Sequence, residues 1–97
     1  MAKEKKVYQR KNIVARIYSI QDGLTEVQKV DFIRIKSERY NLMIMEDYMP
    51  TLGELRGDLT VEAEGKTFRW ENVNGFYIHQ NNLFRFMLRE ERTEEAI

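Results

Sequence analysis

The chain has 97 residues, of which 42% are hydrophobic and 33% charged, and its formal net charge at pH 7 is zero. This length and composition predict one soluble globular domain rather than a disordered chain. The absence of cysteine excludes disulfides, zinc–thiolate sites and thiol catalysis, and it favours a reducing, cytoplasmic environment. The balanced charge argues against general nucleic-acid binding, and no apolar run is long enough for a transmembrane helix.

Charges of opposite sign gather at the two ends of the chain. The start carries Lys3, Lys5, Lys6, Arg10 and Lys11 against Glu4, and the end carries Glu90, Glu91, Glu94 and Glu95 against Arg89 and Arg92. We predict a basic, flexible arm over 1–11 and an acidic tail over 91–97, on either side of one domain over 12–90. Such segments are typical of solvated ends; the alternative is a basic arm that touches an anionic membrane surface or a partner.

Hydrophobic alternation predicts extended strands in the first half of the domain. A strand is expected over 13–20, and its end is marked by the turn residues Gln21-Asp22-Gly23. The next segment, 25–35, changes its apolar phase midway, which indicates a β-bulge. The segment 40–45 is apolar on both faces, so it is either a central strand or a strand with one face against a partner.

The second half is predicted to be a loop followed by two hairpins. Residues 46–57 contain Pro50, which blocks a central strand, so this segment is expected to be irregular. One hairpin turns at Glu64-Gly65-Lys66, and the last hairpin turns at Gln80-Asn81-Asn82. In the final strand Phe84, Phe86 and Leu88 alternate with Leu83, Arg85, Met87 and Arg89.

These elements predict an all-β fold. Short strands separated by turn signals every 8–12 residues or so are typical of a sandwich or barrel. We therefore expect a single antiparallel β-sandwich or flattened barrel of about seven to nine short strands. After residue 90 the sequence allows a short C-terminal helical turn at most.

The sequence holds no cluster of residues that requires a particular chemistry. His79 is the only histidine, so a metal site would need carboxylates for its other ligands; a structural or surface role is the simpler interpretation. The neighbouring Glu46 and Asp47 could serve acid–base chemistry or bind a cation, but adjacent side chains on an extended segment point apart. We therefore expect no enzyme activity, no metal and no cofactor.

The order of landmarks resembles the N-terminal β-sandwich domain of the epsilon subunit of F-type ATP synthases. The stretch Ile33–Pro50 follows the pattern of that family without a gap. Asn74-Gly75-Phe76 stands where the family has SGGF, and Gln80-Asn81-Asn82 stands at its last turn. The similarity covers residues 13–92 in order and spacing, with few exact identities.

The chain also departs from this family. Glu46-Asp47-Tyr48 replaces the family's PGH, and only residues 90–97 stand where its C-terminal helical hairpin would begin. The resemblance implies that Met43–Leu52 is the end of the sandwich that faces the membrane rotor ring. The changed loop weakens that expectation, and without such a hairpin in this sequence we do not expect the family's restraint of the motor by helix extension.

Two surfaces are candidates for contact with a partner. The first surrounds the loop and consists of Met43, Met45, Glu46, Asp47, Tyr48, Met49 and Leu52, because methionines and exposed apolar patches are common in interfaces. The second is a sheet face made of Tyr77, Arg85 and Met87, with Arg89 beside them. Plain core filling and an ordinary solvated sheet face are the alternatives.

The resulting hypothesis is a non-enzymatic, cytoplasmic protein-interaction domain. By resemblance it docks on the central stalk of an ATP synthase and couples the stalk to the rotor ring, so it reaches the membrane only through a partner. The alternative is a free-standing relative that acts as an accessory or regulatory binding module, including one that associates with itself.

Overall fold

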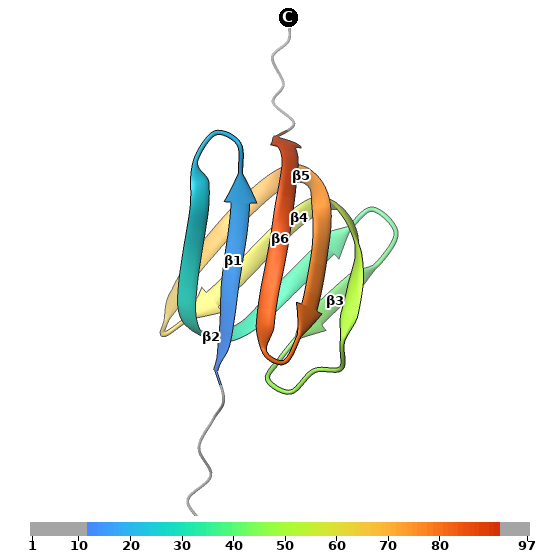
Figure 1. Cartoon of the computed structure of the whole chain (residues 1–97). Coiled ribbons are helices and arrows are strands. Elements are labelled where there is room, and N and C mark those ends of the chain that lie inside the picture. The colour runs from blue at the N-terminus through green and yellow to red at the C-terminus, as the bar shows by residue number, and fades with distance from the viewer. Residues whose placement is uncertain (1–11, 92–97) are drawn as a thin grey trace, which may run out of the picture.

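The computed structural model of the chain describes residues 12–91, which form six strands and no helix (Figure 1). The strands are β1 (Ile13–Ser19), β2 (Gly23–Ser37), β3 (Asn41–Ile44), β4 (Thr51–Ala63), β5 (Lys66–Gln80) and β6 (Leu83–Glu91). Within these residues no helix has the length and apolarity that a membrane span requires. The predicted arm over 1–11 lies outside the described part. The acidic tail was predicted to begin at 91 and the strand to end by 90, but β6 continues to Glu91; residues 92–97 of that tail, with the possible helical turn, lie outside the described part.

The strands close into a flattened barrel. Their order is β1-β6-β5-β4-β2, and the ring closes through an additional pairing of β2 with β1, while β3 lies outside the ring on β2. The pairing of β1 with β6 is parallel and the other pairings are antiparallel. The all-β sandwich or barrel expected from the sequence is therefore confirmed.

Three strands are longer than the sequence indicated. β2, β4 and β5 contain 15, 13 and 15 residues, so six strands cover the described chain where seven to nine short ones were expected. Their ladders shift register between Val30 and Phe32, between Gly57 and Leu59, and at Asn74/Gly75. A bulge bends a strand without ending it, and these bends carry each long strand around the barrel.

The first half of β4 corrects the expected loop. Residues 51–57 were predicted to be irregular, but they pair with β5 from Thr51 onward. Pro50 lies just before the strand, where its missing N–H costs no ladder hydrogen bond. Only residues 45–50 connect β3 to β4.

The apolar segment 40–45 is not central. β3 pairs with β2 alone in the described part of the chain, and it lies outside the closed ring. One face of β3 reaches the core through buried Ile44, while Met43 is exposed. The position of β3 is consistent with the other interpretation of this apolar segment, in which one face of the strand meets a partner.

The core follows the predicted alternation. Phe84, Phe86 and Leu88 of β6 are buried, as expected. The other buried hydrophobic side chains are Ile13, Ala15, Ile17, Val27, Val30, Ile33, Ile35, Ile44, Leu55, Leu59, Val61, Ala63, Val73 and Tyr77. The turn between β5 and β6 places Asn81 and Asn82 at φ 53° and 58°, the left-handed conformation that a two-residue hairpin turn requires.

Candidate protein-interaction surfaces

The loop over 45–50 lies at one end of the barrel and is fastened to the β5–β6 turn. The amide of Tyr48 donates to the carbonyl of Met45 (3.1 Å), which closes a tight turn, and Asp47 in that turn has φ 60°. The Asp47 amide donates to Oδ1 of Asn82 (2.7 Å), and Nδ2 of Asn82 donates to Oδ1 of Asp47 (3.1 Å). These two bonds, called here the Asp47–Asn82 clasp, hold the loop at a fixed position.

Four of the predicted residues form an exposed apolar surface around this loop. We call Met43, Met45, Met49 and Leu52 the loop patch. Met49 and Leu52 are the most exposed, at 65% and 72% of their surface. The patch lies on the loop and on the strands at its two ends, β3 and β4. These four predicted residues are therefore exposed in and beside the loop, where they are accessible to a partner.

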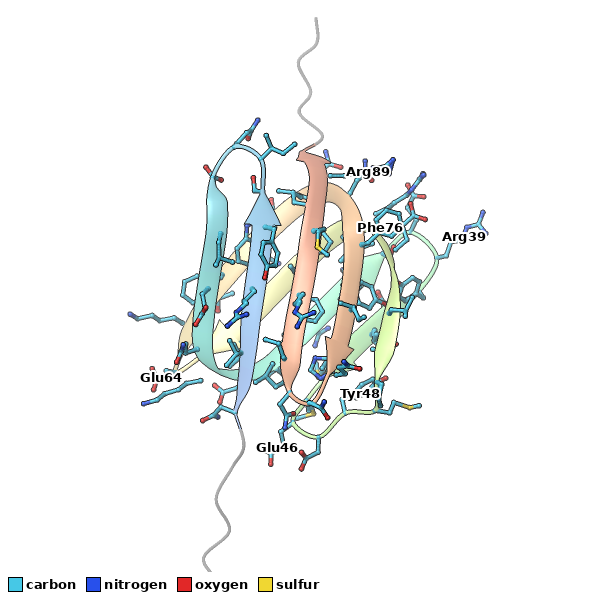
Figure 2. The ribbon with its side chains drawn as sticks, viewed as in Figure 1. Arg39, Glu46, Tyr48, Glu64, Phe76 and Arg89 are labelled. Carbon is cyan, nitrogen blue, oxygen red and sulfur yellow. The ribbon has the colours of Figure 1, made fainter. Side chains whose placement is uncertain are left out.

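Tyr48 differs from its neighbours because its ring covers the core. It is half-buried and packs against the core cluster. Its ring meets the ring of His79 edge-on, with centroids 6.4 Å apart. Figure 2 shows Tyr48 and Glu46 at the same end of the barrel. Tyr48 therefore acts at least partly as a structural cover, and the methionines around it remain the accessible contacts.

His79 lies beneath this cover. Its side chain is fully buried, and neither ring nitrogen has a hydrogen-bond partner among the described residues. Burial lowers the pKa of His79 below its ordinary value, because a desolvated imidazolium is unfavourable. The described residues contain no group of three or more His, Asp or Glu side chains that could hold a metal ion. A structural role for His79 fits this geometry.

Tyr77 does not lie on the second predicted surface. It is only 4% exposed and stacks on Phe84 inside the barrel, with ring centroids 5.8 Å apart. The register explains the position, since Tyr77 pairs with Phe86 across β5 and β6, and directly opposed residues point to the same face. Arg85 and Met87 are exposed on the outer face, as expected.

Phe76 takes the place expected for Tyr77 and extends the surface. Phe76 pairs with Met87, Met87 with Tyr18, and Tyr18 with Leu24. These four residues form one row across β5, β6, β1 and β2, which we call the outer row. Phe76 is 50% exposed and Met87 46%, and the Arg89 guanidinium lies 5.8 Å from the centre of the Phe76 ring. Figure 2 shows Phe76 and Arg89 together at the end opposite Tyr48.

The Asp47–Asn82 clasp provides the first testable prediction. Replacing Asn82 with glycine keeps the positive φ of the turn but removes both clasp bonds, so we expect a loss of about 0.5–1.5 kcal/mol in unfolding free energy. Amide exchange at Asp47 should accelerate at the same time. Asn81→Gly is the matched control, because Asn81 shares the positive φ. Equal losses in the two variants would show that the clasp contributes nothing.

The fold is similar to that of chains in solved ATP synthase structures. No family model matches the chain, and no curated protein matches its sequence. Among solved structures, a chain of the Euglena gracilis mitochondrial ATP synthase (OSCP, F1 and c-ring) matches with a TM-score of 0.68 and 19% identity. A chain of the Tetrahymena thermophila mitochondrial ATP synthase central stalk and c-ring matches with a TM-score of 0.66 and 15% identity.

Both matches cover most of this chain but a smaller share of the neighbouring chains. The first covers 93% of this chain and 61% of the Euglena chain, and the second covers 86% of this chain and 67% of the Tetrahymena chain. The chain therefore spans about three fifths to two thirds of the length of these neighbours. At this level of identity the similarity shows a shared fold. It is the fold that the resemblance to the ATP synthase epsilon subunit implied.

Proposed function

We propose that the chain is a non-enzymatic subunit that docks on the central stalk of a rotary ATP synthase and links the stalk to the membrane rotor ring. The observation that carries the proposal is the match over nearly the whole described barrel to chains from two ATP synthase assemblies that contain the c-ring. Two exposed apolar surfaces support it, because a subunit between a stalk and a ring needs two contact regions.

The two surfaces suit different contacts. The loop patch lies at one end of the barrel, and by resemblance this end faces the ring. The outer row runs across β5, β6, β1 and β2 on the barrel wall, so it suits lateral packing against the stalk. Arg85 and Arg89 lie on the same side of β6 as Met87, two residues away on either side. Exposed aromatic, methionine and arginine side chains are enriched in interfaces.

Recovery of partners on the tagged chain, from detergent-solubilised native membranes and from cytosol, tests this proposal. We expect the stalk and catalytic subunits of an ATP synthase to be recovered with the wild-type chain. Met87→Glu should reduce that recovery at least tenfold by placing a charge in the outer row. Met49→Glu should reduce recovery of the ring while the stalk is retained. Lys36→Gln on exposed β2 changes the net charge equally and should have no effect.

A second candidate is an accessory or regulatory module outside the ATP synthase. The observation that favours it is that Glu46-Asp47-Tyr48 stands where the family has PGH, in a loop that the Asp47–Asn82 clasp holds to the β5–β6 turn. Under this alternative the loop patch binds another protein. Recovery of no ATP synthase subunit, together with an outer-row variant that changes nothing, would contradict the first proposal and favour this one.

A further inference from the structure

The two halves of β4 differ in how many neighbours they have. From Gly57 to Ala63 the strand pairs with β2 on one side and β5 on the other. From Thr51 to Leu55 it pairs with β5 alone in the described chain. At Arg56 the carbonyl accepts a hydrogen bond from the Glu38 amide in the β2–β3 turn (3.0 Å). The first half of β4 therefore has one open edge, which Figure 1 shows beside the β2–β3 turn.

Two hydrogen bonds to side chains show which backbone groups of β4 point to this edge. The Glu54 carbonyl accepts a hydrogen bond from the Tyr40 hydroxyl (2.6 Å), and the Arg56 amide donates to Oγ of Ser37 (3.0 Å). Both groups point away from β5. Because a strand's backbone groups alternate in direction along an antiparallel ladder, the N–H and C=O of Leu52 and the N–H of Glu54 point to the open edge as well.

This edge borders a cavity in the described structure. The cavity has a volume of about 730 Å³ and is lined by Ser37, Glu38, Arg39, Tyr40, Leu42, Thr51, Leu52, Gly53, Glu54, Arg56 and Tyr77. It therefore lies between the open edge of β4 and the β2–β3 hairpin. Its inner wall includes the half-buried side chain of Leu42 and the buried ring of Tyr77.

Two tyrosine hydroxyls lie at this edge, and one of them donates a hydrogen bond to a backbone carbonyl of β4. Tyr40 gives its single proton to the Glu54 carbonyl, so the 2.9 Å contact between the two hydroxyls has Tyr77 as the donor. Burial raises the pKa of Tyr77, which keeps that proton in place. A Cβ at Gly53 would lie 2.7 Å from the Tyr77 hydroxyl oxygen, so glycine at this position lets the tyrosine hydroxyl pack directly against the backbone of β4.

We propose that this edge is a strand-addition site for an extended peptide segment of a partner protein. The segment pairs with Leu52 and Glu54 through backbone hydrogen bonds, which is how exposed sheet edges capture peptides. Side chains on one face of the segment enter the cavity towards Leu42 and Tyr77, so an apolar residue is favoured there. About five residues span the open half of β4. The charges of Glu54 and Arg56 pair with each other (3.2 Å), so the segment needs no particular net charge.

The test uses linear peptides selected from a random displayed library on the immobilised wild-type chain. Their Kd is then measured by fluorescence anisotropy for the wild type, Leu52→Ala and Leu52→Pro. Proline removes the N–H at the open edge but no ladder bond to β5, so the variant should fold; its thermal unfolding is recorded to check this. Leu52→Ala keeps the N–H and is the matched control.

Binding through the edge predicts a specific pattern. Leu52→Pro should bind peptide at least tenfold more weakly than Leu52→Ala, because both variants lack the leucine side chain and only the proline variant lacks the N–H. Bound peptide should also slow amide exchange at Leu52 and Glu54 in the wild type. Failure to select any linear peptide, or equal affinity for the proline and alanine variants, would overturn the proposal. So would sedimentation of the wild type as a dimer that Leu52→Pro converts to a monomer, because the edge would then bind a second copy.

This inference is independent of the ATP synthase assignment. The pull-down tests the side chains of Met87 and Met49. Leu52 belongs to the loop patch as well, but the contrast between its proline and alanine variants tests only its backbone amide. Either one can fail while the other succeeds.

Discussion

Replacing Phe86 with alanine is expected to lower the free energy of unfolding by about 3–5 kcal/mol. The side chain is fully buried and lies opposite Tyr77. A Cβ at Gly75 would lie only 2.7 Å from the Phe86 ring, so the ring packs directly on the backbone of β5. The paired strands on both sides of β6 cannot close over the space left by the ring, which places the cost towards the upper end. Urea denaturation with a fixed m-value measures it.

Met87→Ala is the control for this experiment. Met87 is the next residue of β6 but faces outward and is 46% exposed, so its loss should cost less than about 1 kcal/mol. The contrast between neighbours tests the direction of the alternation as well as the burial. Similar losses in the two variants would mean that Phe86 is not a core residue of the folded chain in solution.

The success of the β6 prediction comes from the local nature of its rules. Alternation along one strand depends only on which side of the pleat each residue takes. The Asn81-Asn82 turn depends only on two residues that tolerate positive φ, and both have it. Nothing distant in the chain has to be known for either inference. The turn and the buried face of β6 could therefore be predicted from about ten consecutive residues.

The misplacement of Tyr77 also has a local cause. The turn was expected to contain Gln80, but Gln80 pairs with Leu83 and belongs to the strand. Counting one extra turn residue shifts the pairing by one, and a shift of one moves every side chain of the strand to the other face. Tyr77 was thus placed opposite Arg85, and Phe76 was overlooked. With the two-residue turn, Phe76 falls opposite Met87 and the outer row could have been found.

The long bent strands could not be derived in the same way. Lys29 and Asn72 have φ values of 56° and 57°, and each lies close to a register shift in β2 or in the β4–β5 ladder. At the level of sequence a bulge and a turn look alike, because both interrupt the alternation. Only the neighbouring strand, which continues to pair across the interruption, shows that the strand does not end. The open edge of β4 is missed for another reason, because Pro50 predicts an irregular segment over residues 46–57.

His79 was expected to have a structural or surface role at a hairpin end, and its side chain is completely buried. We therefore expect the free energy of unfolding to decrease at acid pH. In the folded chain burial lowers the pKa of His79 below 6.5, while in the unfolded chain the ordinary value applies. Above that value the imidazole is neutral in both states. As the pH falls through it, the unfolded chain binds a proton that the folded chain does not bind. Stability therefore decreases towards acid pH, by up to about 1.4 kcal/mol per pH unit.

The measurement is the unfolding free energy of the wild type and of His79→Gln between pH 7.5 and pH 5. Glutamine is polar and does not titrate, so it is expected to cost stability at neutral pH, but its curve should be flatter than that of the wild type. The difference between the two proteins should therefore shrink as the pH falls. Parallel curves over this range would mean that the folded chain protonates His79 as readily as the unfolded one.

Tyr48 is expected to influence how steeply the unfolding free energy depends on pH. Its ring covers His79 from the loop side, and Phe84 lies on the imidazole with ring centroids 6.1 Å apart. Removing the cover by Tyr48→Ala admits water to the imidazole, so the pKa of His79 should move back towards its ordinary value and the slope of stability against pH should flatten. A Tyr48→Phe variant keeps the ring and should keep the wild-type slope. The acid sensitivity of the core thus depends on the same loop that presents the methionines of the loop patch.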